Sequence, residues 1–174
     1  PGGVCALYGC QAKKYYYEVA QLVATARHLH GSGVTAPPAV SWADIRAAKN
    51  QFTEPIPQGT ETSLRGSGID YFSGSAKFQD NRSVRVDGEL LEADYFVIAA
   101  GAKPMHLPFS GAELLATSNE FLDLAELPPR IVFVGGGFIS FEFAHFAARL
   151  GPQNGALHII ETMERPLGPF DQDM

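Results

Sequence analysis

The sequence has few cysteines, no cluster of basic residues and no long apolar run. Two cysteines in 174 residues are too few for a disulfide-rich secreted scaffold. The 13 Lys and Arg residues are outnumbered by 19 Asp and Glu residues and form no block, so we expect no nucleic-acid partner. No apolar run approaches the roughly 20 residues needed to cross a bilayer, and no signal peptide is recognisable. We therefore expect a cytoplasmic protein without a membrane partner.

The composition is that of a soluble globular protein. Apolar residues make up 45% and charged residues 18% of the chain, which is too apolar for a disordered segment. The length corresponds to one domain or slightly more. Because the chain begins at Pro1 rather than at a methionine, we expect it to be a segment of a longer protein.

The first third of the chain has the residue spacing of helices. Apolar residues recur at helical intervals over residues 10–30. Residues 41–44 (SWAD) are typical of a helix start, with an oxygen-bearing cap and an acid in the first turn, and the predicted helix continues over residues 45–52. The prolines that follow interrupt this helix, and residues 60–64 resume it.

A different pattern begins after residue 68. The alternation of side chains predicts short strands over residues 69–72, 74–78, 83–86 and 90–93. Asp87 and Gly88 form a two-residue hairpin signal. The apolar run at residues 95–99 predicts a strand covered on both faces, and a stretch rich in Gly and Pro follows it.

A boundary is expected at residues 127–129 (LPP). Beyond it the sequence predicts the beginning of a βαβ arrangement. Its parts are a strand at residues 131–134, a helix at 139–150 and a second strand at 156–160.

The turn between this strand and this helix contains three glycines. Gly135, Gly137 and Ser140 occupy the small-residue positions of a G-x-G-x-x-S pattern, which typically brings a helix N-terminus against a pyrophosphate. Glu161 follows the next strand, where an acid holds ribose hydroxyls and favours NAD(H) over NADP(H). Arg165 lies close by and weakens that preference. The alternative is a glycine-rich turn that binds no ligand.

Cys5 and Cys10 form a C-x-x-x-x-C pattern before the first predicted helix. We expect Cys5 on an irregular lead-in, Gly9 at a turn, and Cys10 in the first helical turn, where the helix N-terminus favours a thiolate. A redox pair is one interpretation. Ordinary buried thiols, a structural disulfide, or zinc binding together with His28 and His30 are the alternatives.

Four segments together resemble the flavoprotein pyridine nucleotide–disulfide oxidoreductases, the family that includes glutathione reductase and dihydrolipoamide dehydrogenase. Residues 2–14 (GGVCALYGCQAKK) resemble its G-G-T-C-x-x-x-G-C-x-P-K-K segment, and residues 98–104 (IAAGAKP) resemble its A-T-G-x-x-P segment. Residues 135–142 (GGGFISFE) resemble its second glycine fingerprint. Residues 164–171 (ERPLGPFD) resemble the stretch after its ribose-binding acid.

The resemblance implies a role for each matching residue. Cys5 would attack the substrate, and Cys10 would face the flavin. Lys13 and Glu142 would form an ion pair, and Phe138 would cover the flavin until nicotinamide displaces it. Cofactor-binding positions are implied at Gly3, Lys14, Ala100, Gly101, Gly135, Gly137, Phe138, Ile139, Glu142 and Glu161. Ala12 and Ala100 depart from the family pattern, which has Pro and Thr there.

The fold expected from this resemblance is α/β, part of a flavoprotein with two dinucleotide-binding domains. Residues 1–128 would belong to a Rossmann-like FAD domain with an antiparallel β segment, and residues 129–174 would begin an NAD(P) domain. The implied activity passes hydride from NAD(P)H through FAD to a Cys5–Cys10 disulfide and on to a small-molecule disulfide, in a homodimer of the longer protein. A nucleotide-binding or thiol redox-sensing module without turnover is the alternative, and a catalytically inactive remnant kept for interaction is a third.

Overall fold

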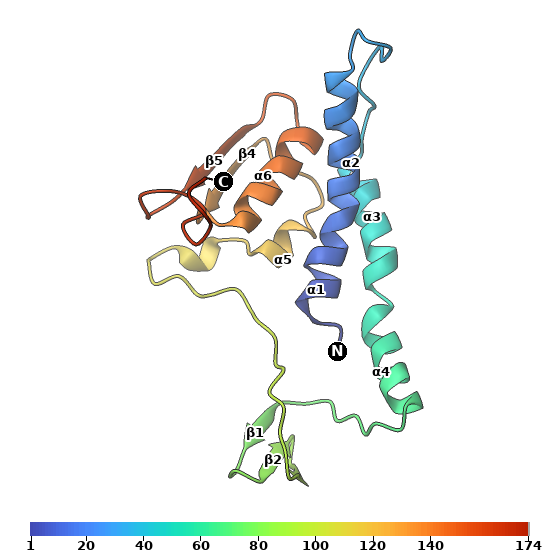
Figure 1. Ribbon diagram of the computed structural model, residues 1–174, viewed down its shortest axis with the longest axis vertical. Helices are drawn as coiled ribbons and strands as arrows, with labels where there is room; N and C mark the ends of the chain where they lie inside the picture. The colour runs from blue at the N-terminus through green and yellow to red at the C-terminus, as the bar shows by residue number, and fades with distance from the viewer. Residues whose placement is uncertain (174) are drawn as a thin grey trace.

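The computed structural model describes residues 1–173 and combines a helical body with two small sheets (Figure 1). The helices are α1 (Gly3–Leu7), α2 (Cys10–His28), α3 (Trp42–Thr53), α4 (Ile56–Gly66), a 3₁₀ turn η1 (Ala112–Leu114), α5 (Ser118–Phe121) and α6 (Phe138–Leu150). The strands are β1 (Ala76–Phe78), β2 (Ser83–Val86), β3 (Glu89–Glu92), β4 (Arg130–Val134) and β5 (Ala156–Ile160). The predicted α/β class is confirmed. No helix within residues 1–173 is both long and apolar enough to cross a membrane.

Helix α2 buries one face along its length. Ala12, Tyr16, Ala20 and Val23 recur every three or four residues and are all buried. The helix ends at His28, so the prediction for residues 10–30 is confirmed except at its last two residues.

Helix α3 starts where its cap predicts. The backbone N–H of Asp44 donates to Oγ of Ser41 at 3.2 Å, which satisfies one of the free donors of the first turn. Trp42, Ile45 and Lys49 lie on the buried face that follows. Pro55 then caps α4, which is longer than the predicted residues 60–64.

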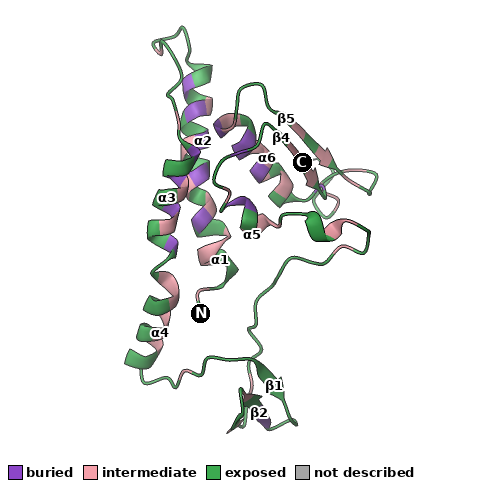
Figure 2. Cartoon of the chain, turned by 180° about the vertical axis from the view of Figure 1, so that it is seen from behind, coloured by how far each residue is buried: buried purple, intermediate pink, exposed green. Residues whose placement is uncertain are grey.

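The core lies where α2, α3 and α6 meet, and Figure 2 shows the buried residues gathered there. The ring of Tyr16 on α2 lies 4.5 Å from Trp42 on α3 and 6.1 Å from Phe146 on α6. Phe121 stacks on Phe143 at 4.5 Å. Aromatic rings from four elements therefore fix the position of α6 against α2.

Helix α5 belongs to this core although no periodicity predicts it. A capping box stabilises it: Thr117 and Glu120 exchange hydrogen bonds, with the N–H of Thr117 donating to Oε2 of Glu120 at 2.6 Å. The hydroxyl of Tyr16 donates to the carbonyl of Leu122 at 2.6 Å. Four residues are too short to show a helical pattern in sequence, and tertiary contacts hold this turn in place.

Strands β1, β2 and β3 form an antiparallel sheet in that order. Asp87 and Gly88 form the predicted turn, with φ of 43° and 103°. The predicted strands at 83–86, 90–93 and 74–78 are confirmed within one or two residues at their ends. The strand predicted at residues 69–72 is wrong, because this segment runs without a strand partner.

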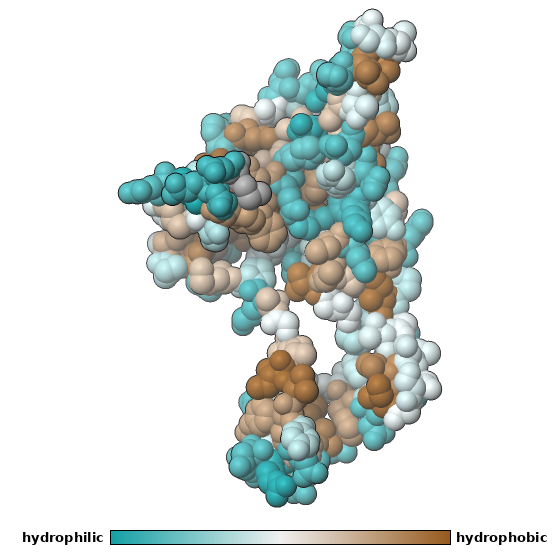
Figure 3. Space-filling model, in the orientation of Figure 1, coloured by the Kyte–Doolittle hydropathy of each residue, from teal (hydrophilic) through white to brown (hydrophobic). Residues whose placement is uncertain are grey.

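The strand predicted at residues 95–99 is also wrong. Tyr95 and Val97 are each 91% exposed and Ile98 is 78% exposed, and no strand forms. Figure 3 shows apolar surface in this part of the molecule. An apolar run becomes a buried strand only beside other strands, and no strand within residues 1–173 pairs with it.

The predicted βαβ unit is confirmed. Strands β4 and β5 pair in parallel, from Arg130 beside Ala156 to Val134 beside Ile160. Helix α6 connects them and ends at Gly151, as expected. The strands and the helix each begin within one residue of their predicted starts.

Candidate functional site

The first turns of α2 and α6 meet at one edge of the core. The ammonium group of Lys13 pairs with Oε2 of Glu142, although 129 positions separate the two residues. Nζ of Lys13 also lies 5.7 Å from the ring centroid of Phe138, within the range of a cation–π contact. The ion pair that the resemblance implied is therefore present in the structure.

The two cysteines lie just before this ion pair. Cys10 is the first residue of α2, as expected, but the expected irregular lead-in at Cys5 is wrong. Cys5 belongs to the short helix α1, which the N–H of Tyr8 closes by donating to the carbonyl of Val4 at 2.9 Å. Both cysteines are exposed and free thiols in this structure.

Gly9 allows α1 and α2 to approach each other. A Cβ at this position would lie 2.9 Å from Cα of Cys5 and 2.9 Å from the oxygen of Val4. A larger residue would push the backbone of Cys5 away from the start of α2. Gly9 therefore keeps the two cysteine backbones close together.

Helical geometry places Cys10 and Lys13 near each other, because residues three apart share one face. The side chain of Lys13 is 13% exposed and that of Glu142 is 44% exposed, so the pair borders the solvent. Lys14 and Gly3 are exposed, and the structure brings neither to the ion pair. The resulting surface presents a thiol, an ammonium group, a carboxylate and a phenyl ring.

The glycine turn has the geometry that its sequence predicts. Gly135 has φ of 106°, and its N–H donates to the carbonyl of Ile160 at 2.8 Å. Gly137 caps α6, and a Cβ built on it meets no atom within 4 Å. The first backbone N–H groups of α6, including that of Ile139, have no helical partner and favour an anion.

Glu161 reaches back to this turn. The N–H of Gly136 donates to its Oε2 at 2.7 Å, and the N–H groups of Thr162 and Met163 donate to its Oε1 at 2.6 and 3.0 Å. Hydrogen bonds from Met163, Gly136 and Thr162 hold the pKa of the Glu161 carboxyl below its ordinary value. Glu161 is therefore a carboxylate at neutral pH, beside the glycine turn.

Arg165 is bound within its own loop. Its guanidinium group donates to the carbonyls of Leu167, Gly168 and Phe170 at 3.4, 3.0 and 2.5 Å. These bonds use the donors that a second phosphate would need. The structure thus removes the reason why Arg165 weakened the preference for NAD(H).

Ala100 and Gly101 lie on the exposed segment before η1, and a Cβ on Gly101 would meet no atom within 4 Å. The structure does not bring these two residues to the surface formed by Cys10 and Lys13 (Figure 1). Their implied contact with FAD stays a prediction.

Sequence reasoning missed the aromatic contact at the site. Phe170 meets Phe138 edge to face, with ring centroids 6.4 Å apart. The only signal in the sequence was that Phe170 lies within the segment resembling the family. Because 32 positions separate the two rings, no local pattern could have paired them.

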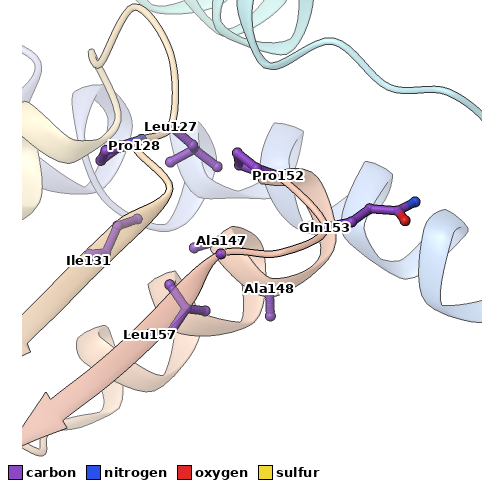
Figure 4. A pocket seen from close by; sticks show the side chains of 9 residues that line it. Leu127, Pro128, Ile131, Ala147, Ala148, Pro152, Gln153 and Leu157 are labelled. Atoms are coloured by element: carbon purple, nitrogen blue, oxygen red, sulfur yellow. The ribbon is translucent and has the colours of Figure 1, made fainter.

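Two hollows lie outside this surface. One, of about 210 Å³, lies at the opposite end of β4 and β5 from the glycine turn, and Figure 4 shows its apolar lining from Leu127, Ile131 and Leu157. The other, of about 360 Å³, lies between the end of α1 and the polar face of α3. In the described part of the chain, no group of three or more His, Cys, Asp or Glu residues is arranged to hold a metal ion.

Comparison with known proteins is consistent with these features. The family model described as "Pyridine nucleotide-disulphide oxidoreductase" matches residues 1–174. The chain is 33% identical to dihydrolipoyl dehydrogenase of Bacillus subtilis (strain 168) over 182 residues, which cover 99% of this chain and 39% of the relative. It is 32% identical to glutathione reductase of Burkholderia cepacia over 158 residues, which cover 90% of this chain and 35% of the relative.

A solved structure shares the fold. The HOCl-induced flavoprotein disulfide reductase of Escherichia coli, in a Cu(II) complex, aligns with a TM-score of 0.70 and 24% identity. The alignment covers 99% of this chain and 37% of that one. The chain thus spans less than two fifths of the length of each of these proteins.

Proposed function

The chain belongs to the pyridine nucleotide-disulphide oxidoreductase family, and from this premise we propose that it contributes the redox cysteine pair and the nucleotide-binding turn of an FAD-dependent oxidoreductase. Electrons would pass from NAD(P)H through FAD to a Cys5–Cys10 disulfide and then to a small disulfide substrate. One observation carries the proposal. The cysteine end of α2 and the glycine-turn end of α6 meet, and Lys13 contacts both Glu142 and Phe138.

The residues at the glycine turn fit a dinucleotide. The open space beside Gly137 lets a pyrophosphate approach the backbone, and the N-terminus of α6 offers it N–H donors. The carboxylate of Glu161 lies at the carboxyl end of β5, where it can accept bonds from ribose hydroxyls. These residues would hold the nucleotide so that Phe138 and Glu142 border its nicotinamide end.

The same residues favour NAD(H) over NADP(H). Glu161 is charged at neutral pH and would repel a 2′-phosphate. Arg165 cannot offset this repulsion, because its donors are bound to three carbonyls. We therefore assign the chain a preference for NAD(H).

The residues near the cysteines fit one side of a flavin. Cys10, Lys13 and Glu142 border the solvent on one surface, where a planar ring could lie against them. The bound nucleotide and flavin would supply two electrons to this surface. Lys13 stabilises negative charge that develops beside it, and Glu142 fixes the direction of the ammonium group.

The cysteines carry the chemistry of the chain itself. Two electrons and a proton break the S–S bond and leave a thiolate at Cys10 and a thiol at Cys5. Deprotonated Cys5 then attacks one sulfur of the substrate disulfide, forms a mixed disulfide and releases one thiol. The Cys10 thiolate attacks Cys5, releases the second thiol and restores the Cys5–Cys10 bond.

Oxidation of the full chain tests the cysteine pair. Oxidised glutathione should convert wild type into a form with an internal Cys5–Cys10 bond that has lost both alkylatable thiols. Cys5→Ser and Cys10→Ser should instead each retain one bound glutathione. Wild type that carries glutathione on both cysteines without forming the internal bond would contradict the proposal.

Substitution at Gly137 tests the nucleotide site. Gly137 has an ordinary extended backbone and no atom within 4 Å of its Cβ position, so Gly137→Val should fold as wild type does. It should nevertheless weaken NADH binding at least about tenfold in calorimetry, because the side chain fills the space of the pyrophosphate. Gly59→Val, in α4, introduces the same side chain far from the turn as a control. Equal NADH affinity in wild type and Gly137→Val would contradict this site.

A thiol switch without turnover is the second candidate, and the exposure of both free thiols favours it. The two candidates differ in one measurement. If the chain is redox machinery, NADH together with FAD should restore both thiols of the oxidised chain, and Glu142→Gln should slow this step. If it is a switch, only added thiols should reduce it.

A further inference from the structure

The loop that follows β5 folds back over the glycine turn. The N–H of Leu167 donates to the carbonyl of Gly136 at 2.8 Å, while the N–H of Gly136 donates to Glu161. A Cβ on Gly136 would lie 3.1 Å from Cβ of Pro166. Both backbone groups of Gly136 are thus bound to residues 161–167, and the loop and the turn form one unit.

Arg165 ties this loop together. Its guanidinium group bonds to the carbonyls of Leu167, Gly168 and Phe170, which are two, three and five positions further on. Leu167 has φ of 56°, a conformation that costs a non-glycine residue roughly 1–2 kcal/mol. The bonds from Arg165 hold the chain in this unfavourable turn, and the turn directs Phe170 back toward α6.

Phe170 connects the loop to the cysteine surface. Its ring meets Phe138 edge to face at 6.4 Å, and Lys13 lies over the ring of Phe138 at 5.7 Å. Phe138 is 51% exposed, so these two contacts are what holds its otherwise open ring. A change at Arg165 is therefore transmitted through Phe170 to Phe138.

We propose that Arg165 is a positioning residue that holds residues 166–170 over the glycine turn and, through Phe170, sets the place of Phe138 at the nicotinamide end of the site. This role rests on the proposed function for its ligand. It differs from that of a phosphate-binding arginine, because the guanidinium group acts on carbonyls of its own loop. Arg165 consequently contributes to NADH and NADPH binding by the same factor.

Two measurements on the full chain test the proposal with Arg165→Met, Arg165→Lys and Arg130→Met. Arg130 is exposed at the far end of β4 from the turn and serves as the control. In the ligand-free chain, amide exchange at Leu167 should be about tenfold faster in Arg165→Met and unchanged in Arg130→Met. Arg165→Lys should restore little protection, because an ammonium group cannot span three carbonyls as a guanidinium fork does.

The second measurement is calorimetric titration with NADH and with NADPH. Arg165→Met should raise both dissociation constants about tenfold and leave their ratio unchanged. Phe170→Leu should reproduce most of the effect, and the double variant should lose little more than Arg165→Met alone. A loss confined to NADPH would overturn the proposal, because it would make Arg165 a ligand of the 2′-phosphate.

The two measurements separate this inference from the function on which it rests. Unchanged exchange at Leu167 in Arg165→Met overturns the positioning role whether or not the nucleotide binds. Wild type that binds neither nucleotide overturns the proposed function, while the exchange result still decides whether Arg165 holds the loop.

Discussion

Two regions of this chain contain similar apolar side chains and treat them in opposite ways. In the body formed by α2, α3 and α6, Phe143 is 2% exposed and Leu122 is fully buried. In the region from β1 to the segment before η1, Tyr95 and Val97 are 91% exposed. Figures 1 and 2 show that this second region lies apart from the helices. Burial depends on the partners that the fold provides, and apolar character alone does not secure it.

The largest difference is expected from aromatic truncation. Phe143→Ala should lower the free energy of unfolding by about 3–5 kcal/mol, because it leaves a cavity beside Phe121 in the core. Tyr95→Ala, the matched change in the exposed region, should alter it by less than about 0.5 kcal/mol. Urea denaturation followed by circular dichroism measures both. Equal effects would mean that the exposed segment is packed in solution.

The second comparison lies within the body, at the ion pair of Lys49 and Asp123. Lys49 is 2% exposed, whereas the side chain of Asp123 is 48% exposed. Asp123→Asn leaves a buried ammonium group without its counter-charge and should cost about 3 kcal/mol. Lys49→Met leaves a carboxylate that water can reach and should cost about 1 kcal/mol. If denaturation gave the reverse order, the burial of Lys49 would not be the dominant cost.

A smaller and local effect is expected in the antiparallel sheet. Gly88→Ala places a side chain at φ of 103°, which should cost about 1 kcal/mol. The sheet has few neighbours, so amides of β2 and β3 should exchange about fivefold faster while those of α2 are unaffected. Hydrogen–deuterium exchange with peptide resolution measures this. Faster exchange in α2 as well would show that the two regions unfold together.

The smallest effect concerns pH. Burial, and secondarily the charge of Arg149, lower the pKa of His145 below its ordinary value of 6.5. Folding therefore favours the neutral ring, so stability is complete above about pH 6.5 and falls as the pH drops through the lowered pKa. His145→Gln should remove a loss of less than about 1 kcal/mol on acidification. An identical pH dependence of the melting temperature in both proteins would contradict this.

Local signals predicted the elements whose boundaries depend on nearby residues. Ser41 caps α3, Asp87 and Gly88 form a hairpin, and the glycines at 135–137 open α6. The strand at 95–99 was predicted wrongly because its pattern specifies a covered strand and says nothing about whether a partner is present. The short helix α5 was missed because its stability comes from Tyr16 and a capping box.

The candidate site divides in the same way. The resemblance indicated Lys13 and Glu142 as partners, and the structure confirms their contact. The aromatic contact between Phe138 and Phe170, and the commitment of Arg165 to three carbonyls, had no local signal. Such contacts join residues through the folded chain, and a linear pattern records only neighbours along the sequence.

By itself, the sequence determined the helical and βαβ patterns, the glycine turn and the family to which its motifs point, because each depends on residue types at short fixed spacings. Only the tertiary structure decided that Lys13 meets Glu142, that Arg165 faces its own loop, and that the run at 95–99 stays exposed. Each of these outcomes depends on which distant surfaces the packed core brings together, and packing is a property of the whole described chain.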